Sequence, residues 1–174
     1  REEVDLVGLL VDTVADARAA GPDHDWQLDL AVLEPPADAT PEEAEDFLPE
    51  PPLVIGDEAR LRQVVVNLLA NARVHTPAGS HVTTTLAREG DTLIVRIHDD
   101  GPGIAPDVHD RLFERFARGD SSRERRTGST GLGMSIALAI VQSHGGSIDV
   151  GSSTAPEDHG TTFSVRLPAA AVEE

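Results

Sequence analysis

The sequence predicts an α/β fold, a two-layer sandwich in which three main helices cover one face of a mixed sheet of about five strands. Two observations support this prediction. Apolar residues recur at helical spacing over residues 4–20 and 57–76, and a third, apolar helix is expected over residues 134–143. The segments between these helices alternate apolar and polar residues, as strands do. The length of 174 residues suits one domain with a single core.

Composition narrows the classes of function. The chain has no cysteine, which excludes disulfides, thiolate nucleophiles and zinc-thiolate sites. All fourteen basic residues are arginine, so the lysine that a P-loop requires is absent. A net charge of -17 would repel a phosphate backbone, so no nucleic-acid partner is expected. No apolar run approaches the roughly 18 residues of a membrane span, and the start at Arg1 suggests a piece of a longer protein.

The first third of the chain is expected to supply packing elements. The helical pattern of residues 4–20 ends at Gly21-Pro22, where a helix cannot continue. Residues 26–33 alternate as a strand, and residues 53–55 form a second, short strand.

Residues 34–52 differ from the rest of the chain in composition. They hold six of the twelve prolines and seven acidic residues without a single base, which predicts an inserted loop. Thr40-Pro41-Glu42-Glu43 has the form of a capping box, so a short helix that reaches Phe47 and Leu48 is expected inside the loop.

The helix predicted from Asp57 to Thr76 carries the first candidate site. Asp57 is placed to cap it, and its apolar residues form one continuous face. Asn67, Asn71 and His75 follow at i, i+4 and i+8 on a neighbouring face, so their side chains can point at a common target. A half-buried amide costs free energy unless its hydrogen bonds are made. A ligand would satisfy them, and a solvated helix face is the alternative.

A second candidate site follows the strands predicted over residues 81–87 and 92–99. The alternation of the later strand places Asp99 on its buried face and Asp100 on its solvated face. The stretch Gly101 to Ile104 comes directly afterwards, where glycines allow backbone to approach a ligand closely. An aspartate that caps its own turn is the alternative reading of Asp99.

The third quarter of the chain combines rings, guanidinium groups and glycines. Residues 112–118 predict a short helix anchored by two phenylalanines, with Arg115 and Arg118 spaced to act together. A mobile lid is expected over the polar residues 119–130. Residues 128–133 form a glycine-rich stretch that leads into the helix at 134–143, and such a helix N-terminus can hold an anion. His144-Gly145-Gly146 ends this helix, and strands are expected at residues 147–150 and 161–167.

The order of these segments resembles the ATP-binding catalytic domain of histidine kinases, which has the Bergerat fold of the GHKL ATPases. Nearly the whole chain is covered by the similarity, and Gly160-Thr161-Thr162-Phe163 also fits the family. The segments that match the family's N, G1, F and G2 boxes are, in this order, residues 57–76, 99–104, 112–118 and 128–133.

The resemblance implies a role for each matching residue. Asp99 would accept a hydrogen bond from the adenine amino group, and Asn71 would coordinate Mg²⁺ with support from Asn67. Arg118, with Arg115, would clamp the γ-phosphate, and Asn67 would belong with them to the catalytic set. An ATP lid would cover residues 117–131. The full set of implied cofactor-binding residues is Asn71, Asp99, Gly101, Gly103, Gly128, Thr130, Gly131, Leu132 and Gly133.

The resemblance also implies how the domain would work. Residues 1–22 would bring the chain into the domain through the first packing helix, and residues 23–174 would form the rest. The domain would transfer the γ-phosphoryl group of ATP to a histidine on a dimerisation hairpin of the same full-length kinase. No helix of this sequence carries such a histidine, so the hairpin lies outside the chain. A cognate response regulator would be the further partner, and the chain would be the cytoplasmic part of a membrane-bound sensor.

Two other functions stay open. Related ATP-hydrolysing clamps carry a glutamate four residues before the Mg²⁺-binding asparagine, where this chain has Asn67. An amide cannot take a proton from water, so Asn67 disfavours the clamp. A nucleotide-sensing module that no longer transfers phosphate is the second alternative.

Overall fold

A five-stranded mixed sheet forms the centre of the structure, a computed structural model that describes residues 1–104 and 130–171. The strands lie in the order β2-β4-β5-β7-β6, with β2 parallel to β4 and every other pair antiparallel. Their bounds are Asp25–Asp29 for β2, His81–Glu89 for β4, Thr92–Asp99 for β5, Ser147–Ala155 for β6 and Asp158–Pro168 for β7. The predicted mixed sheet is therefore confirmed.

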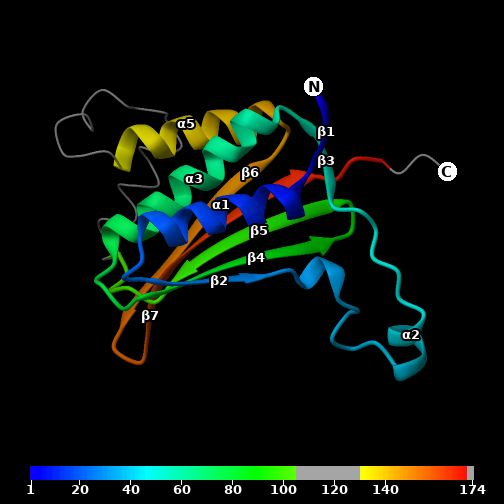
Figure 1. Cartoon of the computed structure of the whole chain (residues 1–174), viewed down its shortest axis with the longest axis horizontal. Coiled ribbons are helices and arrows are strands. Elements are labelled where there is room, and N and C mark those ends of the chain that lie inside the picture. The colour runs from blue at the N-terminus through cyan, green and yellow to red at the C-terminus, as the bar shows by residue number, and fades with distance from the viewer. Residues whose placement is uncertain (105–129, 172–174) are drawn as a thin grey trace.

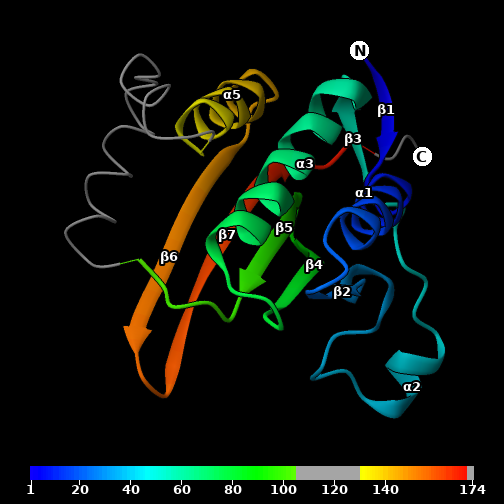
Figure 2. The ribbon, with the colours of Figure 1, turned by 60° about the vertical axis from the view of Figure 1, so that its left-hand side comes forward.

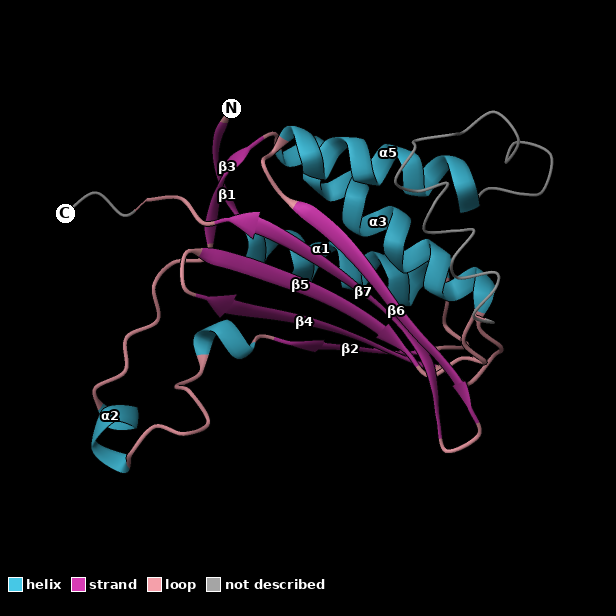
Figure 3. Ribbon diagram, turned by 180° about the vertical axis from the view of Figure 1, so that it is seen from behind, coloured by secondary structure: helices cyan, strands magenta, loops and turns pink. Residues whose placement is uncertain are grey.

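Three helices lie together on one face of this sheet (Figures 1 and 2). They are α1 (Leu6–Ala20), α3 (Glu58–His75) and α5 (Thr130–Ser143). The view from behind shows the strands in front of the three helices (Figure 3). The core fills the space between the layers, and its fully buried side chains include Leu10, Leu68, Leu86, Leu93, Ile97 and Val141. The two-layer arrangement thus agrees with the prediction.

The start of the chain differs from the predicted helix over residues 4–20. Residues Glu2–Asp5 form strand β1, which pairs antiparallel with β3 (Leu53–Gly56) in a separate two-stranded sheet. The helix begins only at Leu6, because the Asp5 side chain caps it by accepting a hydrogen bond from the backbone N–H of Val7 at 2.9 Å. Val4 fitted the helical spacing, yet its side chain is buried in a strand opposite Val54.

The next predicted strand, over residues 26–33, is also shorter than expected. It ends at Asp29, and residues Ala31–Leu33 form a 3-10 turn, η1. Inside the insertion the capping box is confirmed, since Thr40 and Glu43 exchange side chain to backbone hydrogen bonds at the start of α2 (Pro41–Glu45). This helix ends before Phe47 and buries none of its residues. It projects from the body of the domain (Figure 1), so nothing there stabilises a longer helix.

The last helix and strands are longer than predicted. Helix α5 begins at Thr130 rather than Met134. It ends at Ser143, as predicted, and Gly145 just beyond its end takes a positive φ of 75°. Strands β6 and β7 extend past the predicted 147–150 and 161–167 because their polar outer residues pair through the backbone. Apolar alternation detects only the buried part of such strands.

His144 joins the end of α5 to the start of α3. Its Nδ1 donates to the carbonyl oxygen of Ile140 at 2.7 Å, and its Nε2 accepts from the backbone N–H of Asp57 at 3.1 Å. Gly56 leaves space for the ring, since a Cβ at that position would lie 2.4 Å from it. The two helices that carry the candidate site are therefore held together at the end away from the site. Within the described residues, no helix is long and apolar enough to cross a membrane.

Candidate functional site

Helix α3 brings the predicted site segments together along its C-terminal half. Asn67 donates from its side-chain nitrogen to the carbonyl oxygen of Gly133 at 3.2 Å, which fixes the start of α5 beside it. At the end of α3, Thr76 packs against Gly101, where an added Cβ would lie 2.6 Å from the Thr76 methyl group. Nine residues of helix separate these two contacts, a rise of about 13 Å. Asn71 lies between them.

Asn71 has the feature that most strongly indicates a ligand. Its side-chain oxygen is buried and has no hydrogen-bond partner among the described residues. Leaving such an acceptor unsatisfied costs roughly 1–3 kcal/mol. A small pocket of about 120 Å³ lies here, lined in part by Asn67, Asn71 and Gly133. An amide oxygen is a ligand that suits a hard cation such as Mg²⁺.

The rest of the metal coordination would come from the ligand. In residues 1–104 and 130–171, no three His, Asp or Glu side chains are grouped so that they could hold a metal ion. A cation at Asn71 would therefore depend on phosphate oxygens and water, as Mg²⁺ commonly does. The Asn67 nitrogen donates to Gly133, which leaves the amide oxygen, the atom that can coordinate Mg²⁺, free of this contact.

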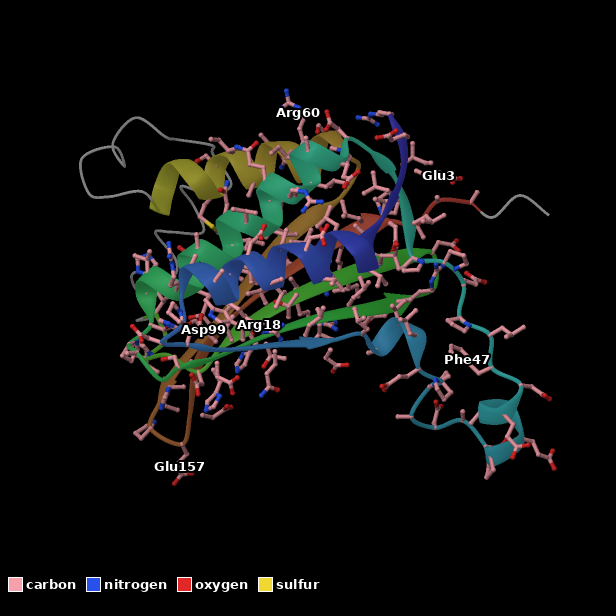
Figure 4. All side chains as sticks on the ribbon, viewed as in Figure 1. Glu3, Arg18, Phe47, Arg60, Asp99 and Glu157 are labelled. Atoms are coloured by element: carbon pink, nitrogen blue, oxygen red, sulfur yellow. The ribbon has the colours of Figure 1, made fainter. Side chains whose placement is uncertain are left out.

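Asp99 lies on the buried face of β5, as predicted, and is only 6% exposed (Figure 4). Its Oδ1 accepts from the backbone N–H of Gly101 at 3.0 Å, so it also caps its own turn. Burial raises the pKa of Asp99, while the Gly101 N–H, the charge of His98 and the Thr161 N–H act in the opposite direction. Asp100 instead accepts from the backbone N–H of His81 at 2.7 Å and is more exposed.

The two glycines after Asp99 are required by the protein's own packing. Gly103 has a positive φ of 76°, and a Cβ on it would lie 2.0 Å from the carbonyl oxygen of Ser153. A Cβ on Gly101 would meet Thr76. The sequence predicts that they let a ligand approach the backbone, and the structure adds this packing as a second reason for glycine.

The glycine-rich stretch at residues 128–133 is partly helical, because α5 begins at Thr130 and not at Met134 as predicted. Thr130, Gly131, Leu132 and Gly133 form the first turn of α5. The backbone N–H groups of a first helical turn lack partners inside the helix, so this arrangement still suits an anion. The remaining predicted site residues, Arg115, Arg118 and Gly128, lie outside the described residues, as do residues 112–118 and most of the predicted lid.

A larger cavity lies elsewhere and does not overlap this site. It has a volume of about 1210 Å³ and lies between the start of α3 and the end of α5, near Arg60, Ile136 and His144. Along α3, the distance from Asp57 to Asn71 is about 21 Å. The larger cavity therefore lies at the opposite end of α3 from Asn71.

The family follows from this fold and a comparison of sequences. Residues 56–171 match the profile of the family described as histidine kinase-, DNA gyrase B- and HSP90-like ATPase. The chain belongs to this ATPase family. The matched residues contain α3, the loop after Asp99 and the start of α5, which are the three segments that the structure brings together.

Relatives within the ATPase family are sensor histidine kinases. Over 168 residues the domain is 48% identical to the probable sensor histidine kinase TcrY of Mycobacterium tuberculosis, covering 97% of this chain and 31% of TcrY. It is 40% identical over 173 residues to the sensor histidine kinase TrcS of the same organism, covering 96% of this chain and 30% of TrcS. The chain thus spans about a third of these relatives and is an ATPase domain of the sensor histidine kinase type.

Solved structures agree with this assignment. The mycobacterial sensor histidine kinase MprB superposes with a TM-score of 0.72 at 28% identity, covering 98% of this chain and 100% of that one. Full-length ShkA in complex with AMPPNP gives 0.70 at 26% identity, covering 98% of this chain and 31% of ShkA. The two-layer fold of the ATPase domain is therefore shared with histidine kinases.

Proposed function

We propose that this ATPase domain binds ATP with Mg²⁺ and transfers the γ-phosphoryl group to a histidine of a dimerisation hairpin in the same full-length kinase. The observation that carries the proposal is the unpartnered, buried oxygen of Asn71. It lies between the loop that follows the buried Asp99 and the glycine-rich start of α5. This order suits a ligand with a base at one end and phosphates at the other.

Each end of the site has a role in this proposal. Asp99 accepts a hydrogen bond from the adenine amino group, beside Gly101 and Gly103. Backbone N–H groups at the start of α5, over Thr130 to Gly133, meet the phosphates. Asn71 would hold Mg²⁺ with support from Asn67, and the bound ion would supply positive charge for the phosphate oxygens. The guanidinium groups of Arg118 and Arg115 clamp the γ-phosphate.

Catalysis in this proposal depends on position and charge and needs no general base. A neutral imidazole nitrogen attacks the γ-phosphorus, the bond to the ADP oxygen breaks, and ADP leaves. Asn67, which cannot take a proton, instead keeps the start of α5 in place through the carbonyl of Gly133. Because Asn67 cannot take a proton from water, it also disfavours hydrolysis of ATP by an activated water.

The proposal extends to the whole protein from which the chain comes. Because the sensor histidine kinase relatives are about three times longer, the dimerisation hairpin would lie in the remaining sequence. The domain would work on the cytoplasmic side of a membrane-bound sensor, and a cognate response regulator would receive the phosphoryl group.

Transfer between separate polypeptides tests the proposal. The chain is mixed with the dimerisation hairpin of its kinase and with ATP labelled in the γ-phosphate. We expect an acid-labile label on the hairpin, which disappears when the hairpin's acceptor histidine is replaced or when this chain carries Asn71→Ala. Binding of ATP without any transfer would contradict kinase activity and favour the nucleotide-sensing module. Rapid hydrolysis by the chain alone would favour the ATP-hydrolysing clamp.

A further inference from the structure

A second element besides α3 holds the loop that follows Asp99. The β6–β7 hairpin, formed by Ser147–Ala155 and Asp158–Pro168, reaches this loop through two polar side chains. The Nδ1 of His159 lies 2.6 Å from the carbonyl oxygen of Gly101. The Oγ of Ser152 accepts from the backbone N–H of Ile104 at 2.7 Å. The two side chains thus contact residues 101–104 at Gly101 and at Ile104.

The donors in these contacts can be assigned from chemistry. A carbonyl oxygen only accepts, so His159 carries a hydrogen on Nδ1 and donates it to Gly101. The Ser152 hydroxyl accepts from Ile104, and its own hydrogen remains for β7, where the carbonyl oxygen of Gly160 lies at 3.1 Å. Ser152 therefore connects both strands of the β6–β7 hairpin to the loop.

Close steric contacts at two glycines restrict the loop in addition to these hydrogen bonds. Gly103 passes so close to β6 that a Cβ would overlap the carbonyl oxygen of Ser153. Gly160 approaches β5 in the same way, since a Cβ there would lie 2.2 Å from the carbonyl oxygen of Asp99. The sheet fixes Asp99 itself opposite Thr161. The shape of residues 101–104 depends in addition on His159 and Ser152.

We infer that His159 and Ser152 are positioning residues that hold the Asp99–Ile104 loop in the shape that accepts the adenine end of the nucleotide. This inference rests on the proposed ATP site. Without either bond the loop samples other shapes, and binding must select one of them. Losing one such hydrogen bond weakens binding by about three- to tenfold. The loss affects ATP and ADP by the same factor, because both carry the same base.

Variants of His159 separate positioning from general support of the fold. Asparagine has an N–H donor close to the position of the His159 Nδ1. The N–H donor of glutamine lies about one bond further from the backbone, and alanine has no donor. We expect His159→Ala to raise the dissociation constants of ATP and ADP together, and His159→Asn to restore most of the affinity. In the transfer assay KM for ATP should rise while kcat stays the same. Ser152→Ala should act in the same direction.

Several results would overturn the inference. One is a folded His159→Ala whose affinity for ATP lies within about twofold of wild type. Another is a variant that loses affinity for ATP but not for ADP. The third is a His159→Asn whose affinity for ATP is no higher than that of His159→Ala. If His159→Ala fails to fold, the comparison of His159→Asn with His159→Gln decides, and equal affinities of these two would reject the inference. Normal binding by wild type together with sensitivity to Asp99→Ala would leave the proposed function intact in each case. A wild-type chain that binds no adenine nucleotide would overturn both.

Discussion

The contact between Gly101 and Thr76 leads to a quantitative prediction. A Cβ added by Gly101→Ala would lie 2.6 Å from the Thr76 methyl carbon, whereas ordinary contacts begin at 3.4 Å. The methyl group or the loop must therefore move by about 0.8 Å, and overpacking of this kind costs roughly 1–3 kcal/mol. We expect Gly101→Ala to lower the free energy of unfolding by this amount, measured by chemical denaturation, and to weaken ATP binding as the loop shifts.

The partner variant Thr76→Ser tests whether this contact is the cause. It removes the methyl group but keeps the hydroxyl, which donates to the Ala72 carbonyl oxygen and contacts His24. In the Thr76→Ser background, Gly101→Ala should cost clearly less than in wild type, because the contact at 2.6 Å is gone and the added Cβ keeps only the tight contact with Asp99 Oδ1 at 3.0 Å. Gly151→Ala, which would meet nothing within 4 Å, is the control for the substitution itself. Equal costs of Gly101→Ala in both backgrounds would refute the reasoning.

Two further predictions concern the same region. Gly103→Ala should lower the free energy of unfolding clearly more than Gly90→Ala, because both glycines have a positive φ but only Gly103 would also strike backbone; equal losses in chemical denaturation would contradict this. Burial raises the pKa of the Asp99 carboxyl in the folded protein above its ordinary value of 3.8. The raised pKa therefore stabilises the folded state fully below pH 3.8, and this stabilisation is lost as the pH rises through the pKa that Asp99 has in the folded protein. Asp99→Asn should therefore raise the free energy of unfolding of the ligand-free chain at pH 7, and this gain should disappear under acid conditions. A gain that stays constant across a pH series would refute the raised pKa of Asp99.

The layers of the fold could be predicted from sequence because they follow from apolar spacing. Leu61, Leu68 and Ala72 mark the buried face of α3 by their separation alone, and the structure buries all three. Val4 was assigned to a helix because one apolar residue fits both a helix and a strand. Its partner Val54 lies 50 positions away, and no local pattern shows that pairing.

The site could be predicted in part, for the same reason. The alternation along β5 identified Asp99 as buried, and the spacing of Asn67 and Asn71 placed both on one side of α3. The hydrogen bond between His159 and Gly101 could not be predicted, because it joins β7 to the loop after β5 across 58 positions of sequence. Residues 151–155 show no apolar alternation, so the predicted strand at residues 147–150 stops short of Ser152, which lies in the part of β6 that the sequence does not indicate.

Calorimetric titration of ATP, with and without Mg²⁺, tests the central claim most directly. The matched variants are Asp99→Asn and Asp100→Asn, which make the same change on the buried Asp99 and on the half-buried Asp100. The account predicts Mg²⁺-dependent binding by wild type and a loss of about tenfold or more in Asp99→Asn, because a charged hydrogen-bond acceptor becomes neutral. It predicts a change within about twofold in Asp100→Asn, whose amide oxygen can still accept from His81. Absence of ATP binding by wild type, or an equal loss in both variants, would contradict the account.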